Sequence, residues 1–135
     1  MFSVETVIKA QFFDIDPMNI VWHGNYARFL EISRCEMLDR LDYNYAQMEA
    51  SGYAFPIVDM RVKYVGPIRF RQQFIVKTTL VDYENRLRFD YVIRDLATGA
   101  VLTRAQTTQA AVRIKTGELC LESPTILLEK VRAVI

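Results

Sequence analysis

The sequence predicts an α+β protein in which a curved antiparallel sheet wraps around one long central helix. A strand pattern opens the chain, an amphipathic helix follows from residue 25 to 41, and four strand candidates occupy residues 55–114. Strands separated by short polar breaks pair as antiparallel neighbours, and a sheet with one apolar face needs a helix to cover it. These three observations together define the predicted fold class.

The opening strand is predicted to run from Phe2 to near Asp16. Apolar and polar residues alternate over the first nine positions, and the apolar pair Phe12–Phe13 follows. Pro17 has no backbone N–H to donate inside a sheet, so the strand must end before it.

The long helix is predicted from a stripe of apolar residues at helical spacing, with the charged residues, Arg34 among them, mostly off the stripe. Directly before the helix, Gly24 permits an unusual backbone conformation, and Asn25 is the expected N-cap. The stripe consists of Tyr26, Phe29, Leu30, Ser33, Met37, Leu38 and Leu41.

The remaining elements follow from turn signals and alternation. Residues 42–51 are predicted to form a loop and a short helix that ends at Gly52, and the four strands cover residues 55–65, 73–83, 87–95 and 100–114. Their order predicts a meander. Ser123 and Pro124 are the expected N-cap and first residue of a terminal helix that reaches Val134.

Composition agrees with a single compact domain over residues 1–135, because 51% of the residues are hydrophobic. A net charge of +1 provides no clustered field for nucleic acid, so small-molecule partners are expected. Cys35 and Cys120 lie far apart without neighbouring metal ligands, which favours reduced thiols in a cytoplasmic protein. No signal peptide or membrane-spanning run is expected.

The segment from Asp14 to Tyr26 holds two carboxylates, a turn and the only histidine of the chain, His23. Free amides at a helix start suit a developing oxyanion, and an upstream carboxylate could attack the same carbonyl carbon, directly or through water. The pattern therefore suggests acyl transfer. The same Asp-x-Asp-Pro spacing is also typical of an Asx turn, and a lone histidine is often structural.

This arrangement resembles the acyl-CoA thioesterases of the hotdog-fold superfamily, in the branch that includes 4-hydroxybenzoyl-CoA thioesterase. The shared pattern is Asp14-Ile15-Asp16, a short turn, Ile20-Val21 with an aromatic residue, Asn25-Tyr26, and Glu31 with Arg34 on the helix. The resemblance implies a hotdog-fold thioester hydrolase acting on an acyl-CoA or an acyl carrier protein thioester.

The resemblance also implies roles for individual residues. Asp16 would be the nucleophile or general base, and amides near His23 and Gly24 would polarise the thioester carbonyl. Tyr26, Asn25 and Glu31 are the expected substrate-binding residues. Glu31 is also the rival catalytic acid, because another hotdog branch uses an acid from the long helix, although a structural role in an ion pair with Arg34 is favoured.

No metal or redox cofactor is expected, because coenzyme A would enter as part of the substrate. Its phosphates need cations at the pocket mouth, and Arg69, Arg71, Arg86 and Arg88 are the candidates, although each also fits an ordinary solvated sheet face. Residues 68–73 lack the acidic residues often seen there in the family, which leaves the carrier open between coenzyme A and acyl carrier protein.

Further expectations concern the assembly and the acyl group. The resemblance implies a homodimer or homotetramer with active sites between subunits, since an open sheet edge is often covered by a second copy. A non-catalytic acyl-binding or scaffold protein and a dehydratase of the same fold stay as alternatives. Trp22, Phe29, Tyr53 and Phe55 could line an aryl pocket or belong to the core.

Overall fold

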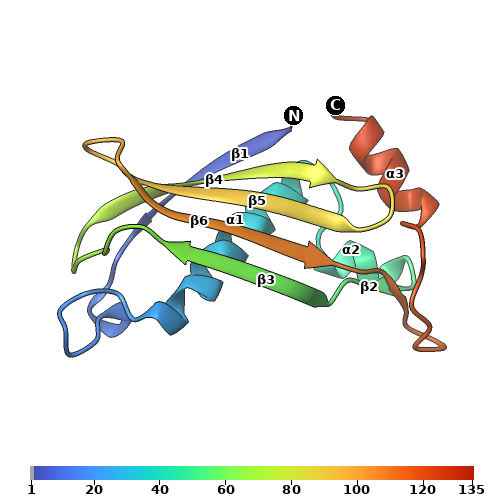
Figure 1. Cartoon of the computed structure of the whole chain (residues 1–135). Helices are drawn as coiled ribbons and strands as arrows, with labels where there is room; N and C mark the ends of the chain where they lie inside the picture. The colour runs from blue at the N-terminus through green and yellow to red at the C-terminus, as the bar shows by residue number, and fades with distance from the viewer. Residues whose placement is uncertain (1) are drawn as a thin grey trace.

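The computed structural model describes residues 2–135 as one curved antiparallel sheet with a long helix, α1 (Tyr26–Arg40), across one face (Figure 1). This arrangement matches the predicted α+β class. The sheet has the strand order β1 (Ser3–Lys9), β4 (Gln73–Asp82), β5 (Leu87–Asp95), β6 (Val101–Gln109) and β3 (Ile57–Tyr64). A separate short ribbon pairs β2 (Tyr53–Ala54) with β7 (Val112–Arg113).

Two shorter α-helices flank the sheet. In α2 (Tyr45–Ala50) the side chain of Asn44 accepts the N–H of Gln47 at 2.9 Å, and Gly52 follows the helix with φ 91°, as the predicted ending requires. In α3 (Thr125–Arg132) Pro124 is the N-cap residue and not the first helical residue, so the helix begins one residue later than predicted. None of the helices within residues 2–135 combines the length and hydrophobicity that a bilayer span requires.

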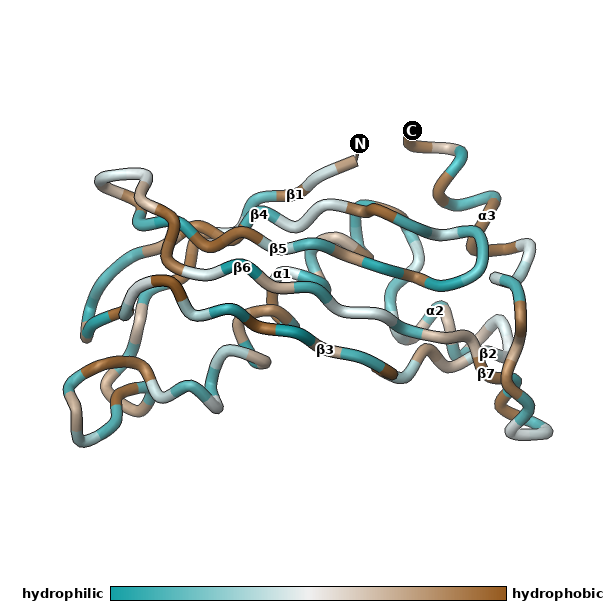
Figure 2. Tube along the Cα trace, in the orientation of Figure 1, coloured by the Kyte–Doolittle hydropathy of each residue, from teal (hydrophilic) through white to brown (hydrophobic). Residues whose placement is uncertain are grey.

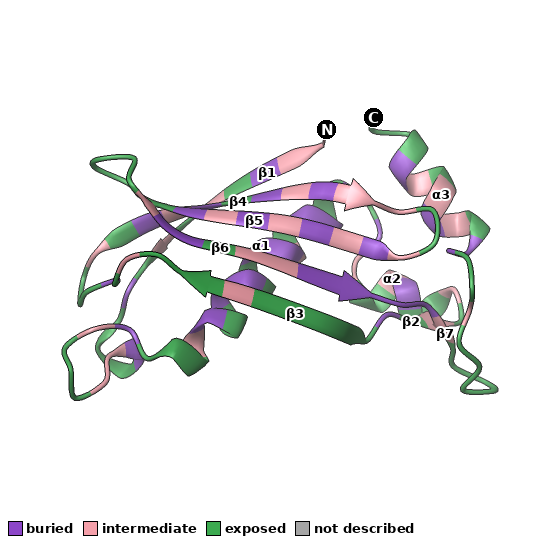
Figure 3. Cartoon of the chain, viewed as in Figure 1, coloured by how far each residue is buried: buried purple, intermediate pink, exposed green. Residues whose placement is uncertain are grey.

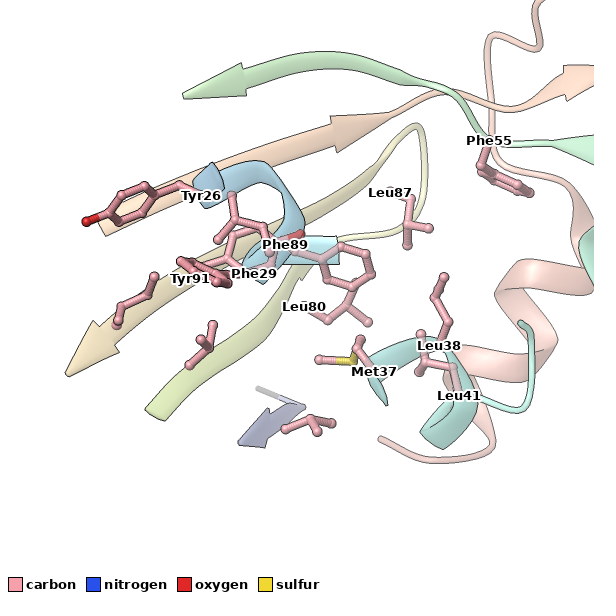
Figure 4. Packing of buried hydrophobic residues seen from close by; sticks show 14 of the residues in the cluster. Tyr26, Phe29, Met37, Leu38, Leu41, Phe55, Leu80, Leu87, Phe89 and Tyr91 are labelled. Atoms are coloured by element: carbon pink, nitrogen blue, oxygen red, sulfur yellow. The ribbon is translucent and has the colours of Figure 1, made fainter. Parts of the chain in front are cut away.

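The core lies between α1 and the inner face of the sheet (Figure 4). All seven members of the predicted helix stripe are buried, and so are the alternating residues of β5, from Leu87 to Ile93. The rings of Phe29 and Phe74 meet edge to face at 5.0 Å between centroids. Burying one such side chain contributes roughly 1.5–3 kcal/mol, which explains why the helix stays on the sheet.

The predicted meander is wrong in its first step. β3 pairs with β6, while β4 pairs with β1 on its other side, so β3 and β4 are separated by two strands. The chain crosses the end of the sheet between them. There Ala10 donates its N–H to the carbonyl of Gln72 at 2.9 Å, and Arg71 donates to the carbonyl of Ala10 at 3.0 Å. These two bonds bring the start of β4 beside β1.

The predicted length of the first strand is also wrong. β1 ends at Lys9, and Phe12–Asp14 form a short 3₁₀ helix, η1, in which Phe12 and Phe13 are 80% and 73% exposed. The physical reason is the carboxylate of Asp14, which accepts the N–H of Gln11 at 2.8 Å. This bond turns the chain away from the sheet before the aromatic pair could join it.

Candidate active site

The segment after η1 is a tight loop closed by a bridge between Ile15 and Val21. Inside it, the N–H of Asp16 donates to the carbonyl of Ile20 at 2.9 Å, and the N–H of Asn19 donates to the carbonyl of Asp16 at 2.9 Å. Asn19 has φ 63°, a left-handed conformation that asparagine tolerates better than most residues. The loop therefore holds the backbone of Asp16 by both its N–H and its carbonyl.

The side chain of Asp16 is half-buried and anchored by one oxygen. Its Oδ1 accepts the N–H of Met18 at 2.8 Å, which is the Asx turn that the sequence suggested. Pro17 lies between them, where its fixed φ suits the turn. For Oδ2 no hydrogen bond is recorded within residues 2–135. The turn and a catalytic role are thus compatible, because one oxygen holds the geometry and the other is left to react.

Asp14, the other carboxylate of the motif, is 1% exposed and organises the surrounding backbone. Its side chain forms an ion pair with Arg28. Its carbonyl accepts the N–H of Trp22 at 2.9 Å and the side-chain amide of Asn25 at 3.0 Å. Asp14 therefore ties η1 to the start of the long helix.

The helix begins with a 3₁₀ turn, η2 (His23–Asn25), that continues directly into α1. Asn25 occupies the N-cap position of α1, as predicted, but its side chain makes no cap bond, because its amide donates to the carbonyl of Asp14 instead. In the described part of the chain the N–H groups of His23 and Gly24 have no recorded acceptor. First-turn amides of this kind, at the positive end of the helix dipole, can bind an oxyanion.

The packing of Trp22 favours glycine at position 24. A Cβ atom added at position 24 would lie only 2.3 Å from the indole ring, so the ring occupies the space that any larger residue needs. The rings of Trp22 and His23 are 5.2 Å apart, and Trp22 remains 49% exposed. The indole thus covers the outside of the helix start.

A pocket of about 440 Å³ lies beside the loop and the helix start. Its lining comes from the loop, from the first turn of the helix and from the end of β3: Asp16, Met18, Ile20, Val21, His23, Tyr26, Tyr64, Val65, Gly66 and Pro67. The structure therefore brings Asp16, His23 and Tyr26 to one cavity. Burial raises the pKa of Tyr26 above its ordinary value of 10.0, which keeps its phenol neutral there.

Tyr64 belongs to this site although the sequence did not indicate it. Its hydroxyl donates to the carbonyl of His23 at 3.0 Å, and its ring meets that of Tyr26 edge to face with centroids 4.8 Å apart. The residue precedes Gly66 and Pro67, which marks a strand end. No pattern within a single sequence places that end against the segment from Asp14 to Tyr26.

Other predicted binding residues lie outside the pocket lining. Glu31 is exposed on α1, and no ion pair with Arg34 is recorded among residues 2–135. Contrary to its expected position off the stripe, Arg34 is 6% exposed and donates to the hydroxyls of Tyr45 at 2.9 Å and Tyr91 at 3.4 Å. Two phenols, the exposed Tyr45 and the buried Tyr91, take the place of the acidic partner.

The four candidate phosphate-binding arginines divide into two pairs. Arg69 and Arg71 are exposed on the turn beside the loop that contains Asp16, where Ile20 bridges to Arg69. Arg86 and Arg88 belong to the β4–β5 turn and the start of β5, at the end of the sheet near α3 (Figure 1). Arg86 donates to the carbonyl of Leu121 at 3.3 Å. Within one chain, only the first pair lies near Asp16.

The aromatic residues considered for an aryl pocket are also dispersed. Phe29 is fully buried in the core, and Trp22 is absent from the lining of the pocket beside Asp16. Tyr53 and Phe55 border a second pocket of about 560 Å³ between α2 and the short ribbon.

Comparison with known proteins adds independent information. The family model described as the thioesterase-like superfamily matches residues 11–131. A putative acyl-CoA thioesterase, YneP of Bacillus subtilis (strain 168), is 32% identical over 76 residues, 56% of this chain and 55% of that protein. The chloroplastic acyl-acyl carrier protein thioesterase ATL2 of Arabidopsis thaliana is 28% identical over 56% of this chain and 40% of its own. The matches thus span about half the length of these relatives.

Solved structures extend the likeness to nearly the whole chain. A DHNA-CoA thioesterase from Staphylococcus aureus superposes with a TM-score of 0.85 and 28% identity, covering 99% of this chain and 93% of that one. A 4-hydroxybenzoyl-CoA thioesterase mutant, complexed with 4-hydroxybenzoyl-CoA, gives a TM-score of 0.82 at 18% identity over 95% of this chain and 97% of that one. The second likeness concerns the fold alone.

Proposed function

The chain belongs to the thioesterase-like superfamily and has the predicted hotdog fold, and from this premise we propose that it hydrolyses the thioester bond of an acyl-CoA. One observation carries the proposal: the carboxylate of Asp16 and the helix start at His23 border the same pocket, and Gly24 directly follows His23. A thioester carbonyl placed between them would meet a base or nucleophile on one side and amide donors on the other.

The reaction can follow two routes that use the same residues. As a general base, Asp16 takes a proton from water while the water oxygen adds to the carbonyl carbon. As a nucleophile, it forms an acyl anhydride that water then hydrolyses. In both routes the amides of His23 and Gly24 stabilise the negative oxygen, the carbon–sulfur bond breaks, and the products are a free acid and coenzyme A thiol. No step is assigned to a metal or a separate cofactor.

For the carrier, we assign the phosphate contacts to Arg69 and Arg71, since these exposed guanidinium groups lie beside the catalytic loop. Coenzyme A and acyl carrier protein both present a phosphopantetheine arm. The names of the relatives include thioesterases for each carrier. An acyl carrier protein thioester is therefore the second candidate substrate.

We further propose a homodimer or homotetramer, in which two copies pair through β3. This edge strand is exposed along almost its whole length (Figure 3), and hydrophobic and hydrophilic residues alternate along it (Figure 2). Val58 and Met60 are 56% and 47% exposed. An unpaired edge with such side chains is suited to a second copy. Free Cys35 and Cys120 suit a reducing, cytoplasmic location.

The decisive test is the variant Asp16→Asn in a thiol-release assay with short, long and aromatic acyl-CoAs. The substitution keeps the size of the side chain and its acceptor oxygen but removes the base, so kcat/KM should fall by a factor on the order of 10³ while the melting temperature stays close to wild type. The matched control is Asp39→Asn on the exposed surface of α1, which should leave turnover unchanged.

Three other results would redirect the assignment. Nearly full activity in Asp16→Asn would remove this residue from the chemistry. An inactive Glu31→Gln variant beside an active Asp16→Asn variant would indicate the helix-acid geometry of the other hotdog branch. Tight acyl-CoA binding without thiol release in the wild type would favour the non-catalytic binding protein.

A further inference from the structure

Tyr64 joins the edge strand of the sheet to the start of the long helix. Its hydroxyl donates to the carbonyl oxygen of His23 across 41 positions of sequence, at 3.0 Å. Its ring packs edge to face on that of Tyr26, with an interplanar angle of 89°, and lies 6.4 Å from the imidazole of His23. The side chain is thus directed toward the helix start by its packing as well as by its hydrogen bond.

The contacted carbonyl belongs to the same peptide unit as the N–H of Gly24. A peptide unit is planar and its C=O and N–H point in opposite directions, so a hydrogen bond that orients the oxygen of His23 also orients the hydrogen of Gly24. A hydrogen bond accepted by the oxygen also polarises the unit and makes its N–H a stronger donor. Tyr64 therefore acts on one of the two amides assigned to the oxyanion.

The other contacts of this turn reach different backbone groups. Asp14 holds the N–H of Trp22 and the side chain of Asn25 from the loop side. Tyr64 reaches the turn from β3, and it supplies the side-chain bond recorded for the His23–Gly24 peptide unit in the described part of the chain. The turn is consequently held from two sides.

We propose that Tyr64 is a positioning residue for thioester hydrolysis, because its hydroxyl orients and polarises the peptide unit between His23 and Gly24 whose amide binds the oxyanion. This inference rests on the proposed function. The Tyr64 hydroxyl acts through this peptide unit and does not itself contact the reacting atoms. The amide of Gly24 matters most when negative charge develops on the thioester carbonyl oxygen. Loss of the Tyr64 hydroxyl should therefore affect turnover more than substrate binding.

The test is the variant Tyr64→Phe, which keeps the ring on Tyr26 and removes only the hydroxyl. With an acyl-CoA that the wild type hydrolyses, kcat should fall roughly tenfold, as expected for one lost supporting hydrogen bond, while KM changes less than about twofold. The matched control is Tyr83→Phe, because Tyr83 lies after β4 and its hydroxyl has no hydrogen bond recorded within residues 2–135. It should retain the wild-type kcat.

A second measurement reports on the peptide unit itself. In a ¹H–¹⁵N NMR spectrum without substrate, the Gly24 amide proton should move upfield in Tyr64→Phe and stay in place in Tyr83→Phe. A wild-type kcat in Tyr64→Phe, or a lower kcat with an unmoved Gly24 signal, overturns the positioning role and leaves the proposed function intact. A wild-type protein that releases no thiol from any acyl-CoA overturns the proposed function and, with it, this role.

Discussion

At the residue scale, the start of the long helix depends on a close contact between Gly24, which has no side chain, and the large indole of Trp22. The indole of Trp22 lies where a Cβ of residue 24 would be. Because Trp22 is 49% exposed, its ring has room to move outward if that space is taken. The glycine therefore serves the packing of its neighbour as well as access to the amide.

This packing predicts a change of sign between two backgrounds. Gly24→Ala should lower the free energy of unfolding by about 1 kcal/mol, since the indole must leave its preferred rotamer. In a Trp22→Ala background the same change should raise it by roughly 0.5 kcal/mol, because alanine restricts the unfolded chain more than glycine does. Urea unfolding of the four proteins in this double-mutant cycle measures both values. Additive effects would contradict the proposed contact.

At the element scale, α1 is attached to the sheet by a polar network as well as by its apolar stripe. Arg34 donates to the hydroxyl of Tyr91 on β5, which in turn lies 2.6 Å from the hydroxyl oxygen of Thr107 on β6. Burial raises the pKa of Tyr91 above its ordinary 10.0, although the positive charge of Arg34 opposes this shift. The phenol thus stays protonated in the folded protein under conditions in which the unfolded chain releases the proton.

The direction of that pKa shift predicts a loss of stability in alkali. The unfolded phenol ionises near its ordinary pKa of 10.0 and the folded one only at higher pH, so the stability present below pH 10.0 declines as the pH rises toward the folded pKa. Tyr91→Phe should reduce this decline. At neutral pH it should cost about 1–3 kcal/mol, because Arg34 and Thr107 lose a buried partner.

Urea unfolding at neutral and alkaline pH checks both parts, with Tyr83→Phe as the control that keeps the network. If Tyr91→Phe retained the full alkaline decline, ionisation of this buried phenol would not be its source.

At the scale of the whole molecule, the sheet has two edges that differ in character. β1 and β3 are the outer strands, and β3 carries Tyr64 at the end that borders the pocket beside Asp16. Pairing of β3 with a second copy would therefore place an interface next to the turn at His23 and Gly24. In a two-fold dimer a residue near the axis meets its own copy, so a charge introduced there repels itself.

Met60→Lys should accordingly shift the protein from dimer to monomer and lower its thioesterase activity at least severalfold, because lysine on an exposed edge opposes strand pairing. The matched control is Val7→Lys on the other edge strand, where the side chain is 53% exposed. This variant should remain a dimer. Sedimentation velocity distinguishes the two states, and a wild type that sediments as a monomer would refute the interface.

The parts of the structure that depend on local periodicity could be predicted well. The stripe of α1 and the alternation in β5 are visible in the sequence because hydrophobic burial repeats with the period of each element. Asp16 and its turn were recognisable for a similar reason, since the Asx turn, the proline and the following helix lie within about ten residues. The N-cap position of Asn25 was also predictable, but the missing cap bond was not, because its amide donates to the carbonyl of Asp14 instead of capping its own helix.

By itself, the sequence determined the class of the fold, the buried face of the long helix and the carboxylate at the candidate site. Only the tertiary structure decided that β3 pairs with β6, that Arg34 is buried against phenols, and that Tyr64 reaches the carbonyl of His23. Strand order and contacts between distant residues depend on how all the elements pack together. That balance of many weak interactions has no signature in any short stretch of the chain.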